Sequence, residues 1–302
     1  MKKGLLIAFY GFTHLSCLLN AQSGLSGELK TEYIPYSSYI RPEDSMKTDS
    51  KSDFKRMDIS FSIPLSMKKI SEGRIKSWSL LANGSYAKLS HKNYETHLFP
   101  DQMLNAQVGL QHIRPLGGKW SMMVTASAGV YTDLENVNFD DVLGQGGLLF
   151  IKNFTPNLAL GVGPVLTTAF GVPMIMPWIY FDWKTGNKIK FNINFPEGME
   201  AGYQFSDKFA IKAVVGLNGM TVERNKGGKS TLLGYQQITA GIRPELQISK
   251  NVSLRLTGGT ALLRSFSEND RKIKSIFKSK KMEDPRFAST FYMAVSLRWN
   301  LP

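Results

Sequence analysis

The chain lacks most of the residues that would stabilise a small exported protein or build a metal site. Its 302 residues include one cysteine, Cys17, and four histidines. Cys17 lies in the N-terminal segment that we expect to be removed, which excludes disulfides and cysteine metal sites in the mature chain. No run of eighteen apolar residues follows residue 21, so no helical membrane span is predicted. The densest apolar segment, residues 172–181, contains Pro173 and Pro177 and would form a poor helix.

The beginning of the chain has the pattern of a secretory signal peptide. Lys2 and Lys3 form a basic region, residues 4–19 are largely apolar, and Ala21 provides a small residue for cleavage. The sequence therefore predicts a signal peptide over residues 1–21 and one mature domain over residues 22–302. We expect export from the cytoplasm of a Gram-negative bacterium to its outer membrane.

The mature chain is basic, but its charge is dispersed. The formal net charge is +13, with 37 Lys and Arg against 24 Asp and Glu. The positive residues are scattered over strands and loops, whereas a nucleic-acid site needs a concentrated patch. We therefore expect outer-membrane lipid and lipopolysaccharide as partners and no nucleic acid.

The last strand alternates strictly between two faces. Phe291, Val295 and Trp299 share one face with other mostly apolar residues, while Tyr292 and Arg298 share the mostly polar face. The same period of two recurs along most of the chain. After a secretory signal, this pattern is typical of a transmembrane β-barrel with an apolar face toward lipid and a polar face toward the lumen.

Fourteen candidate strands are separated alternately by short turns and longer loops, as in outer-membrane barrels. They cover residues 28–36, 54–65, 78–88, 103–113, 119–132, 146–152, 158–168, 174–183, 188–195, 199–205, 209–218, 232–248, 252–264 and 289–300. A bulge instead of a turn at Pro196, together with one further merger, would give twelve. The fold class is thus an all-β antiparallel transmembrane barrel; the competing fold is a soluble periplasmic β-sandwich.

Aromatic residues concentrate at strand ends beside the short turns. Trp78, Trp120, Trp183 and Trp299 occupy such positions, and we predict that they form an interfacial girdle. Core aromatics of a soluble β fold are the alternative interpretation.

The inward positions carry many charges. The candidate lumen-lining residues are Arg56, Asp58, Lys190, Lys212, Arg243, Glu245, Arg255 and Arg298. They can form a ladder of ion pairs inside a closed barrel, or they can line a pore. Fourteen strands leave room for a small channel unless loops fold inward, and the surplus of basic residues would favour anions.

No catalytic or cofactor motif is present. The segment Gly227-Gly228-Lys229-Ser230 resembles the end of a phosphate-binding loop but lacks the earlier glycine and the following helix. A barrel hydrolase would need a histidine close to a serine, and none of His91, His97 and His112 is followed two residues later by serine. His91 and His97 are expected to be solvated in an outer loop. We predict no enzyme activity, no cofactor and no metal.

The segment Ile193-Asn194-Phe195-Pro196-Glu197-Gly198, continuing through Lys208, and the ending through Trp299 resemble outer-membrane barrels of Bacteroidetes type. The family they resemble is the uncharacterised domain of unknown function 6268. This resemblance implies an outer-membrane barrel of unknown role that the barrel assembly machinery inserts. It supplies no site residues.

Two function classes follow. A small-solute pore with weak anion preference is the first. The alternative is a closed structural or adhesive barrel whose basic outer loops, especially residues 265–286, bind glycolipid or a partner.

Overall fold

The computed structural model describes residues 24–70, 74–94, 99–135, 137–168, 170–171, 173–186, 188–226, 229–270 and 285–301. One antiparallel sheet contains sixteen strands, of which β4 and β15 have only two residues each. The other fourteen form a closed wall, as predicted, and the twelve-strand alternative is wrong. The predicted signal peptide, residues 1–21, lies outside the described residues.

The elements have the following bounds: β1 Ser26–Ile40, β2 Lys47–Lys69, β3 Ile75–Lys88, β4 His91–Lys92, β5 Gln102–Gly117, β6 Trp120–Thr132, the 3-10 turn η2 Phe139–Asp141, β7 Val142–Thr155, β8 Leu158–Thr167, β9 Met174–Thr185, β10 Ile189–Phe195, β11 Gly198–Ser206, β12 Phe209–Lys226, β13 Lys229–Ser249, β14 Val252–Asp270, β15 Arg286–Phe287 and β16 Thr290–Asn300.

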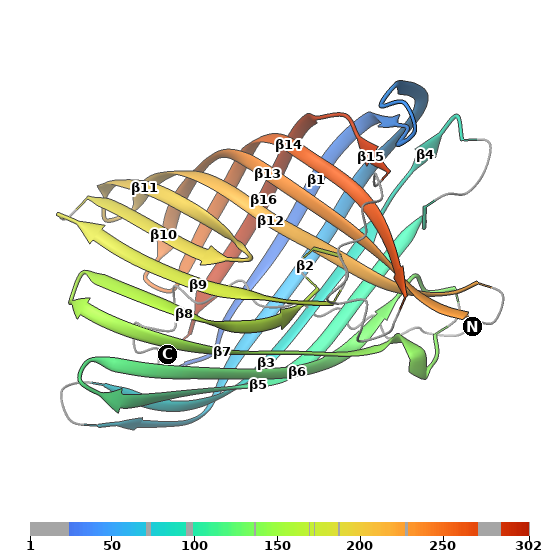
Figure 1. Ribbon diagram of the computed structural model, residues 1–302. Helices are drawn as coiled ribbons and strands as arrows, with labels where there is room; N and C mark the ends of the chain where they lie inside the picture. The colour runs from blue at the N-terminus through green and yellow to red at the C-terminus, as the bar shows by residue number, and fades with distance from the viewer. Residues whose placement is uncertain are drawn as a thin grey trace, which may run out of the picture.

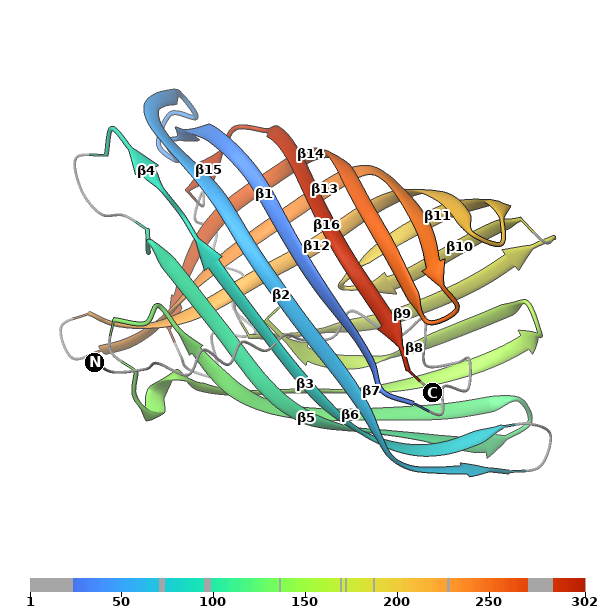
Figure 2. The ribbon, with the colours of Figure 1, turned by 180° about the vertical axis from the view of Figure 1, so that it is seen from behind.

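The last strand closes the barrel on the first. β16 pairs with β1 from Ser26 opposite Asn300 to Tyr33 opposite Met293, so the barrel is closed. Figures 1 and 2 show the strands tilted around a common axis. The start of β1, the end of β16 and turns of a few residues lie at one end, here called the short-turn end, and most longer connections lie at the opposite, long-loop end.

Alternation along the strands separates a lipid face from a lumen face. On β2, Met57 is 40% exposed and points outward, whereas Asp58 is 5% exposed and points inward. A wall that is apolar outside and polar inside suits a bilayer and not water, so the protein is a transmembrane β-barrel. Among the described residues, no helix is long and apolar enough to cross a membrane.

The two ends of the barrel differ in width. β10 and β11 form a short hairpin whose turn lies beside Leu217, partway along β12 (Figures 1 and 2). β12 continues past this turn and meets β6 directly, with Glu223 opposite Thr132 in a parallel pairing. The contact bypasses β7 to β11, so nine of the fourteen strands surround the interior at the long-loop end.

Beyond the β10–β11 turn, the edge of β12 has lost its strand neighbour, and other groups satisfy its backbone. In the orientation that satisfies both contacts, the Asn105 amide accepts from the Thr221 N–H at 3.1 Å and donates to the Thr221 carbonyl at 2.6 Å. The Thr221 hydroxyl donates to the carbonyl oxygen of Gly171 at 2.7 Å, in the connection between β8 and β9.

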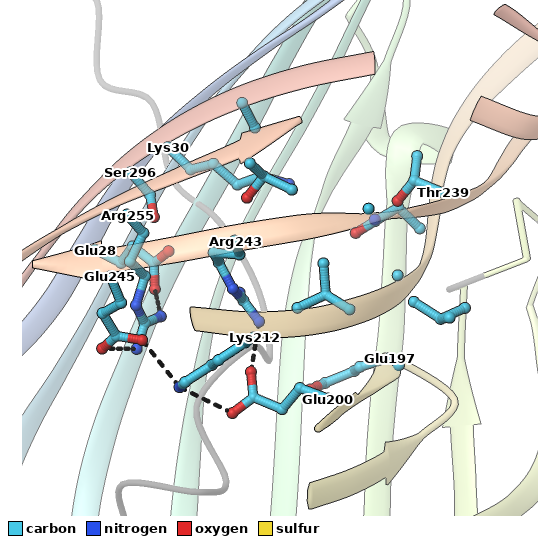
Figure 3. A pocket seen from close by; sticks show the side chains of 18 of the residues that line it. Glu28, Lys30, Glu197, Glu200, Lys212, Thr239, Arg243, Glu245, Arg255 and Ser296 are labelled. Atoms are coloured by element: carbon cyan, nitrogen blue, oxygen red, sulfur yellow. Dashed lines mark hydrogen bonds and ion pairs between the residues drawn. The ribbon is translucent and has the colours of Figure 1, made fainter. Parts of the chain in front are cut away.

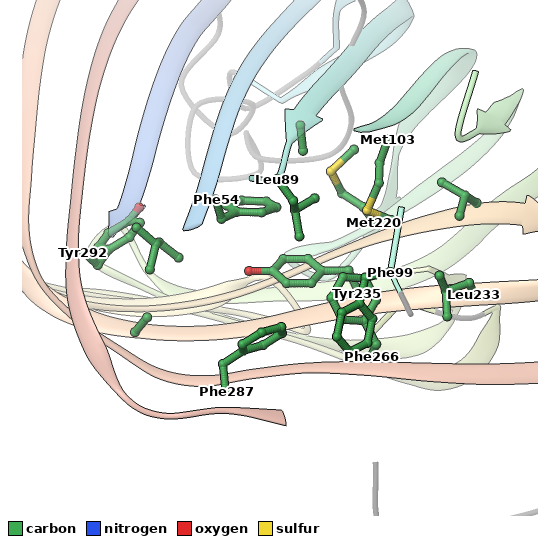
Figure 4. Packing of buried hydrophobic residues seen from close by; sticks show 14 of the residues in the cluster. Phe54, Leu89, Phe99, Met103, Met220, Leu233, Tyr235, Phe266, Phe287 and Tyr292 are labelled. Atoms are coloured by element: carbon green, nitrogen blue, oxygen red, sulfur yellow. The ribbon is translucent and has the colours of Figure 1, made fainter. Parts of the chain in front are cut away.

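Apolar side chains fill the narrow end, as expected where a barrel approaches eight strands. We call this cluster the long-loop core (Figure 4). Its buried members are Ile34, Phe54, Ala87, Leu89, Phe99, Met103, Met220, Val222, Leu233, Tyr235, Ala261, Phe266, Phe287, Tyr292 and Ala294. The Phe99 ring, from the connection between β4 and β5, stacks on Phe266 at 4.4 Å. The lumen is therefore occluded at the long-loop end.

Several predicted strand ends are wrong at the long-loop end. β12 ends at Lys226 instead of residue 218, β13 begins at Lys229 instead of residue 232, and β14 ends at Asp270 instead of residue 264. β1 also ends at Ile40 instead of residue 36, and β2 begins at Lys47 instead of residue 54. Thr221 and Val222 are both fully buried although they point to opposite faces. Where both faces are covered, the alternation between apolar and polar residues that marks a strand disappears.

Candidate functional site: the charged chamber

The lumen remains open as a cavity at the short-turn end. Its volume is about 360 Å³, and we call it the charged chamber. Seven of the eight predicted lumen residues line it: Asp58, Lys190, Lys212, Arg243, Glu245, Arg255 and Arg298. The eighth, Arg56, is buried in the interior, where its Nε donates to Asp58 Oδ1 at 2.7 Å.

The strand register gathers charged side chains of both signs on neighbouring strands. Two cations, Lys212 of β12 and Arg243 of β13, lie opposite each other, and Glu245 lies opposite Arg255 of β14. Gly202, opposite Lys212 on β11, leaves room for the lysine, because a Cβ there would lie 2.9 Å from Lys212 Cγ. The wall thus allows long side chains to meet inside the chamber.

A continuous chain of ion pairs crosses one side of the chamber (Figure 3). In order, it consists of Glu28, Arg255, Glu245, Lys212, Glu200 and Arg243. Lys212 Nζ lies 2.9 Å from Glu245 Oε2 and 3.1 Å from Glu200 Oε1. The chain has three cations and three carboxylates, so its charges balance. Buried ions need such pairing because desolvation is costly.

A second ionic group lies between the chamber and the long-loop core. Lys30 Nζ is 2.6 Å from Glu32 Oε2 and 3.9 Å from Asp58 Oδ2. With Arg56, this group also contains two cations and two carboxylates. On the opposite wall, Lys190 pairs with Asp182 at 3.2 Å.

Arg298 differs from the other lumen cations. It is 8% exposed and lines the chamber, and its Nη2 has no hydrogen-bond partner among the described residues. Glu28 lies opposite Arg298 in the β1–β16 pairing but accepts from Arg255 at 3.4 Å instead. In the described part of the chain, Arg298 has no acidic partner.

A hydrogen-bonded group that the sequence did not reveal lies at the long-loop end. Ser52 Oγ is 2.7 Å from His91 Nδ1, and His91 Nε2 is 3.5 Å from Asp101 Oδ1. Tyr94 completes the group with its hydroxyl 3.0 Å from Ser52 Oγ, and burial raises the pKa of this tyrosine. The expectation that His91 is solvated is wrong, because β4 pairs with β2 and brings the imidazole to Ser52.

This serine, histidine and aspartate have the composition of a hydrolase triad but not its accessibility. The Ser52 side chain is fully buried, so a substrate cannot reach the hydroxyl in this structure. Among the described residues, no group of three or more His, Cys, Asp or Glu is placed to hold a metal ion. His97, which we also expected to be solvated in an outer loop, lies outside the described residues.

The predicted girdle tryptophans are located as follows. Trp78, Trp120 and Trp183 are exposed on the outer face near the short-turn end. Trp78 stacks on His112, with ring centroids 4.2 Å apart. Trp299 lies beside Phe61 at 5.8 Å.

Comparison with known proteins identifies a family but no activity. The family described as Domain of unknown function (DUF6268) matches residues 18–300. The chain belongs to this family. No curated protein matches this DUF6268 chain. Its membership agrees with the resemblance of the Pro196 segment and the C-terminal strand.

Several solved outer-membrane barrels resemble this DUF6268 protein distantly. An outer-membrane channel from Pseudomonas putida F1 is 7% identical, with coverage of 98% of this chain and 96% of that chain and a TM-score of 0.46. The toluene transporter TodX from Pseudomonas putida is 10% identical, with coverage of 96% and 92% and a TM-score of 0.29. The outer-membrane protease OmpT from Escherichia coli is 10% identical, with coverage of 92% and 94% and a TM-score of 0.25. Because all three TM-scores lie below 0.5, nothing about function is inferred from them.

Proposed function

We propose that this protein is an outer-membrane pore for small solutes, closed at its outer end in this state, with a weak preference for anions. The observation that carries the proposal is the charged chamber of about 360 Å³ at the short-turn end. In bacterial outer-membrane barrels this end faces the periplasm. A barrel with only a structural role would need no cavity of this kind.

Anion preference follows from the charges that line the chamber. Six basic residues, Lys30, Lys190, Lys212, Arg243, Arg255 and Arg298, face five acidic residues, Glu28, Asp58, Glu197, Glu200 and Glu245. The surplus is one positive charge, so the preference should be weak. Passage across the membrane requires that the long-loop core move aside.

The long-loop core favours the alternative function, a closed barrel that acts through its outer loops. Much of the basic loop predicted to bind lipopolysaccharide, residues 271–284, lies outside the described residues. The pore and the closed barrel differ in one testable respect: only in a pore does loosening the long-loop core open a path for ions through the lumen.

Conductance in planar bilayers tests the pore. We expect rare or small current steps for the wild type and frequent steps for the double variant F99S/F266S, because it removes the stacked pair of rings from the core. Phe154→Ser, on an exposed ring near the β7–β8 turn, is the matched control and should behave as wild type. If F99S/F266S folds, shown by its heat-modifiable gel mobility, and still passes no current, the closed-barrel alternative holds.

A further inference from the structure

The buried guanidinium of Arg298 has a local charge that the rest of the chamber does not balance. The other basic residues that line the chamber, and Arg56 beside it, each have a carboxylate within 4 Å: Lys30, Arg56, Lys190, Lys212, Arg243 and Arg255. Arg298 has none in the described part of the chain, although it is 8% exposed. An uncompensated buried charge is strongly destabilising, so an anion from solution would stabilise this site.

The strand register places a second guanidinium beside Arg298. Arg298 lies opposite Ser253 on β14, and Arg255, two residues further along β14, lies opposite Ser296. This diagonal arrangement on one face brings long side chains within reach of each other. Arg255 is already bonded to Glu28 and Glu245, but its Nε, like Arg298 Nη2, is buried without a hydrogen-bond partner in the described structure.

We propose that Arg298 binds a small oxyanion, the carboxylate or phosphate group of a solute, at the short-turn end of the charged chamber. A planar guanidinium offers parallel N–H donors that match two oxygens of such a group. The Arg255 Nε–H provides a further donor close by. Arg298 lies two residues from the end of β16, so the oxyanion is held near the entrance of the chamber.

The volume of the chamber limits the size of the solute. About 360 Å³ lies at the small end of the range for ligand pockets. The carboxylates of Glu200 and Glu245 are occupied by Lys212, so the anion does not face unpaired acids on that side. A metabolite of a few carbon atoms with one or two anionic groups fits these constraints. This inference rests on the proposed function only in taking the chamber to be reachable from the short-turn end.

Equilibrium dialysis of the folded protein in detergent, with labelled inorganic phosphate and labelled acetate as probes, tests the site. We expect one saturable site for at least one of the two probes. Arg298→Gln should weaken binding about tenfold or more, because a charge-assisted bidentate contact is lost. Arg298→Lys should bind with an affinity between those of the wild type and Arg298→Gln, since it keeps the positive charge but loses the planar guanidinium with its parallel N–H donors. Lys250→Gln, at the exposed β13–β14 turn of the same end, removes one positive charge outside the lumen and should bind as wild type.

Two results would overturn the proposal. One is equal binding of both probes by wild type and folded Arg298→Gln protein. The other is displacement of the probe by an equal concentration of chloride, which would mean that the site holds any counter-ion. Dialysis needs no open pore, so the site can be demonstrated in a barrel that conducts nothing. Conversely, conductance without oxyanion binding would leave the pore proposal standing and remove this one.

Discussion

One buried side chain joins the separate strands of the long-loop core. Arg264 is 1% exposed, and its guanidinium donates to Ser37 Oγ at 2.9 Å and to the carbonyl oxygen of Ser52 at 3.2 Å. It also lies over the ring of Phe287, 4.7 Å from the centroid. Through these contacts β14 is fastened to the ends of β1 and β2. The partners of this buried cation are neutral hydrogen-bond acceptors and an aromatic ring, where a carboxylate would be the usual partner.

Arg264→Gln should therefore weaken the long-loop end. We expect a loss of about 3 kcal/mol in the free energy of unfolding, because several charge-assisted hydrogen bonds disappear and their acceptors stay buried. Urea unfolding in lipid vesicles, followed by gel mobility, measures the change. Arg286→Gln is the control: this exposed arginine donates to Ser45 at 3.1 Å, and its loss should cost little. Equal stability of the two variants would contradict this role for Arg264.

Ser52 and His91 show the limit of motif searches at the residue scale. The two residues are 39 positions apart, and only the pairing of β4 with β2 brings them together. A search for histidine and serine two residues apart on one strand could not find them. In this structure the buried hydroxyl ties the β3–β5 connection to β2.

At the scale of elements, the β12–β13 hairpin determines how the lumen closes. Beyond the β10–β11 turn its far half stays in the wall, where β12 packs against β5 and β6. The connection between β8 and β9 covers its other side, where Gly171 contacts Gly234 so closely that a Cβ on Gly234 would lie 2.2 Å from the Gly171 carbonyl oxygen. Glycine at residue 234 is thus required by the contact.

Gly234→Val should push the β8–β9 connection away from the hairpin. We expect a loss of about 1–3 kcal/mol in stability, as for other overpacked sites, and more frequent current steps in planar bilayers. Gly258→Val makes the same change on β14 where the added Cβ meets nothing within 4 Å, so it should leave both measurements near wild type. Identical behaviour of the two variants would show that the Gly171 contact does not hold the lumen closed.

Prediction from sequence succeeded for strands with one lipid face and failed where that face is lost. β16 and residues 54–65 of β2 alternate because lipid lies on one side and the lumen on the other. The far ends of β12 and β13 have protein on both sides, so their pattern gave no signal. The inward direction of the chamber residues was predictable for the same reason. Their pairing was not, because it depends on which residues of neighbouring strands are opposite each other and on which of them then bond. The register places Glu28 opposite Arg298, and Arg298 lacks an acidic partner in the described residues because Glu28 bonds Arg255 instead.

For the whole molecule, the outer tryptophans report how the barrel lies in a bilayer. In vesicles with brominated lipids, we expect Trp78, Trp120 and Trp183 to be quenched most by bromines near the headgroups and least by bromines at the bilayer centre. Trp178→Phe should be the starting protein, since Trp178 is buried and points inward, where it donates to Asn194. The strongest quenching from the centre would contradict the girdle, and no quenching at any depth would favour a soluble β fold.

The short β10–β11 hairpin has a mechanical consequence for the membrane around the protein. β10 has 7 residues, which corresponds to a strand of roughly 23 Å and, at a tilt of about 40°, to a height of roughly 18 Å. The hydrocarbon layer is about 30 Å thick. Lipid acyl chains beside this hairpin must therefore compress or splay while those beside β1 and β2 do not. The protein should therefore thin the bilayer only beside the β10–β11 hairpin. A neighbouring membrane protein that favours a thin bilayer should then lie on that side of the barrel.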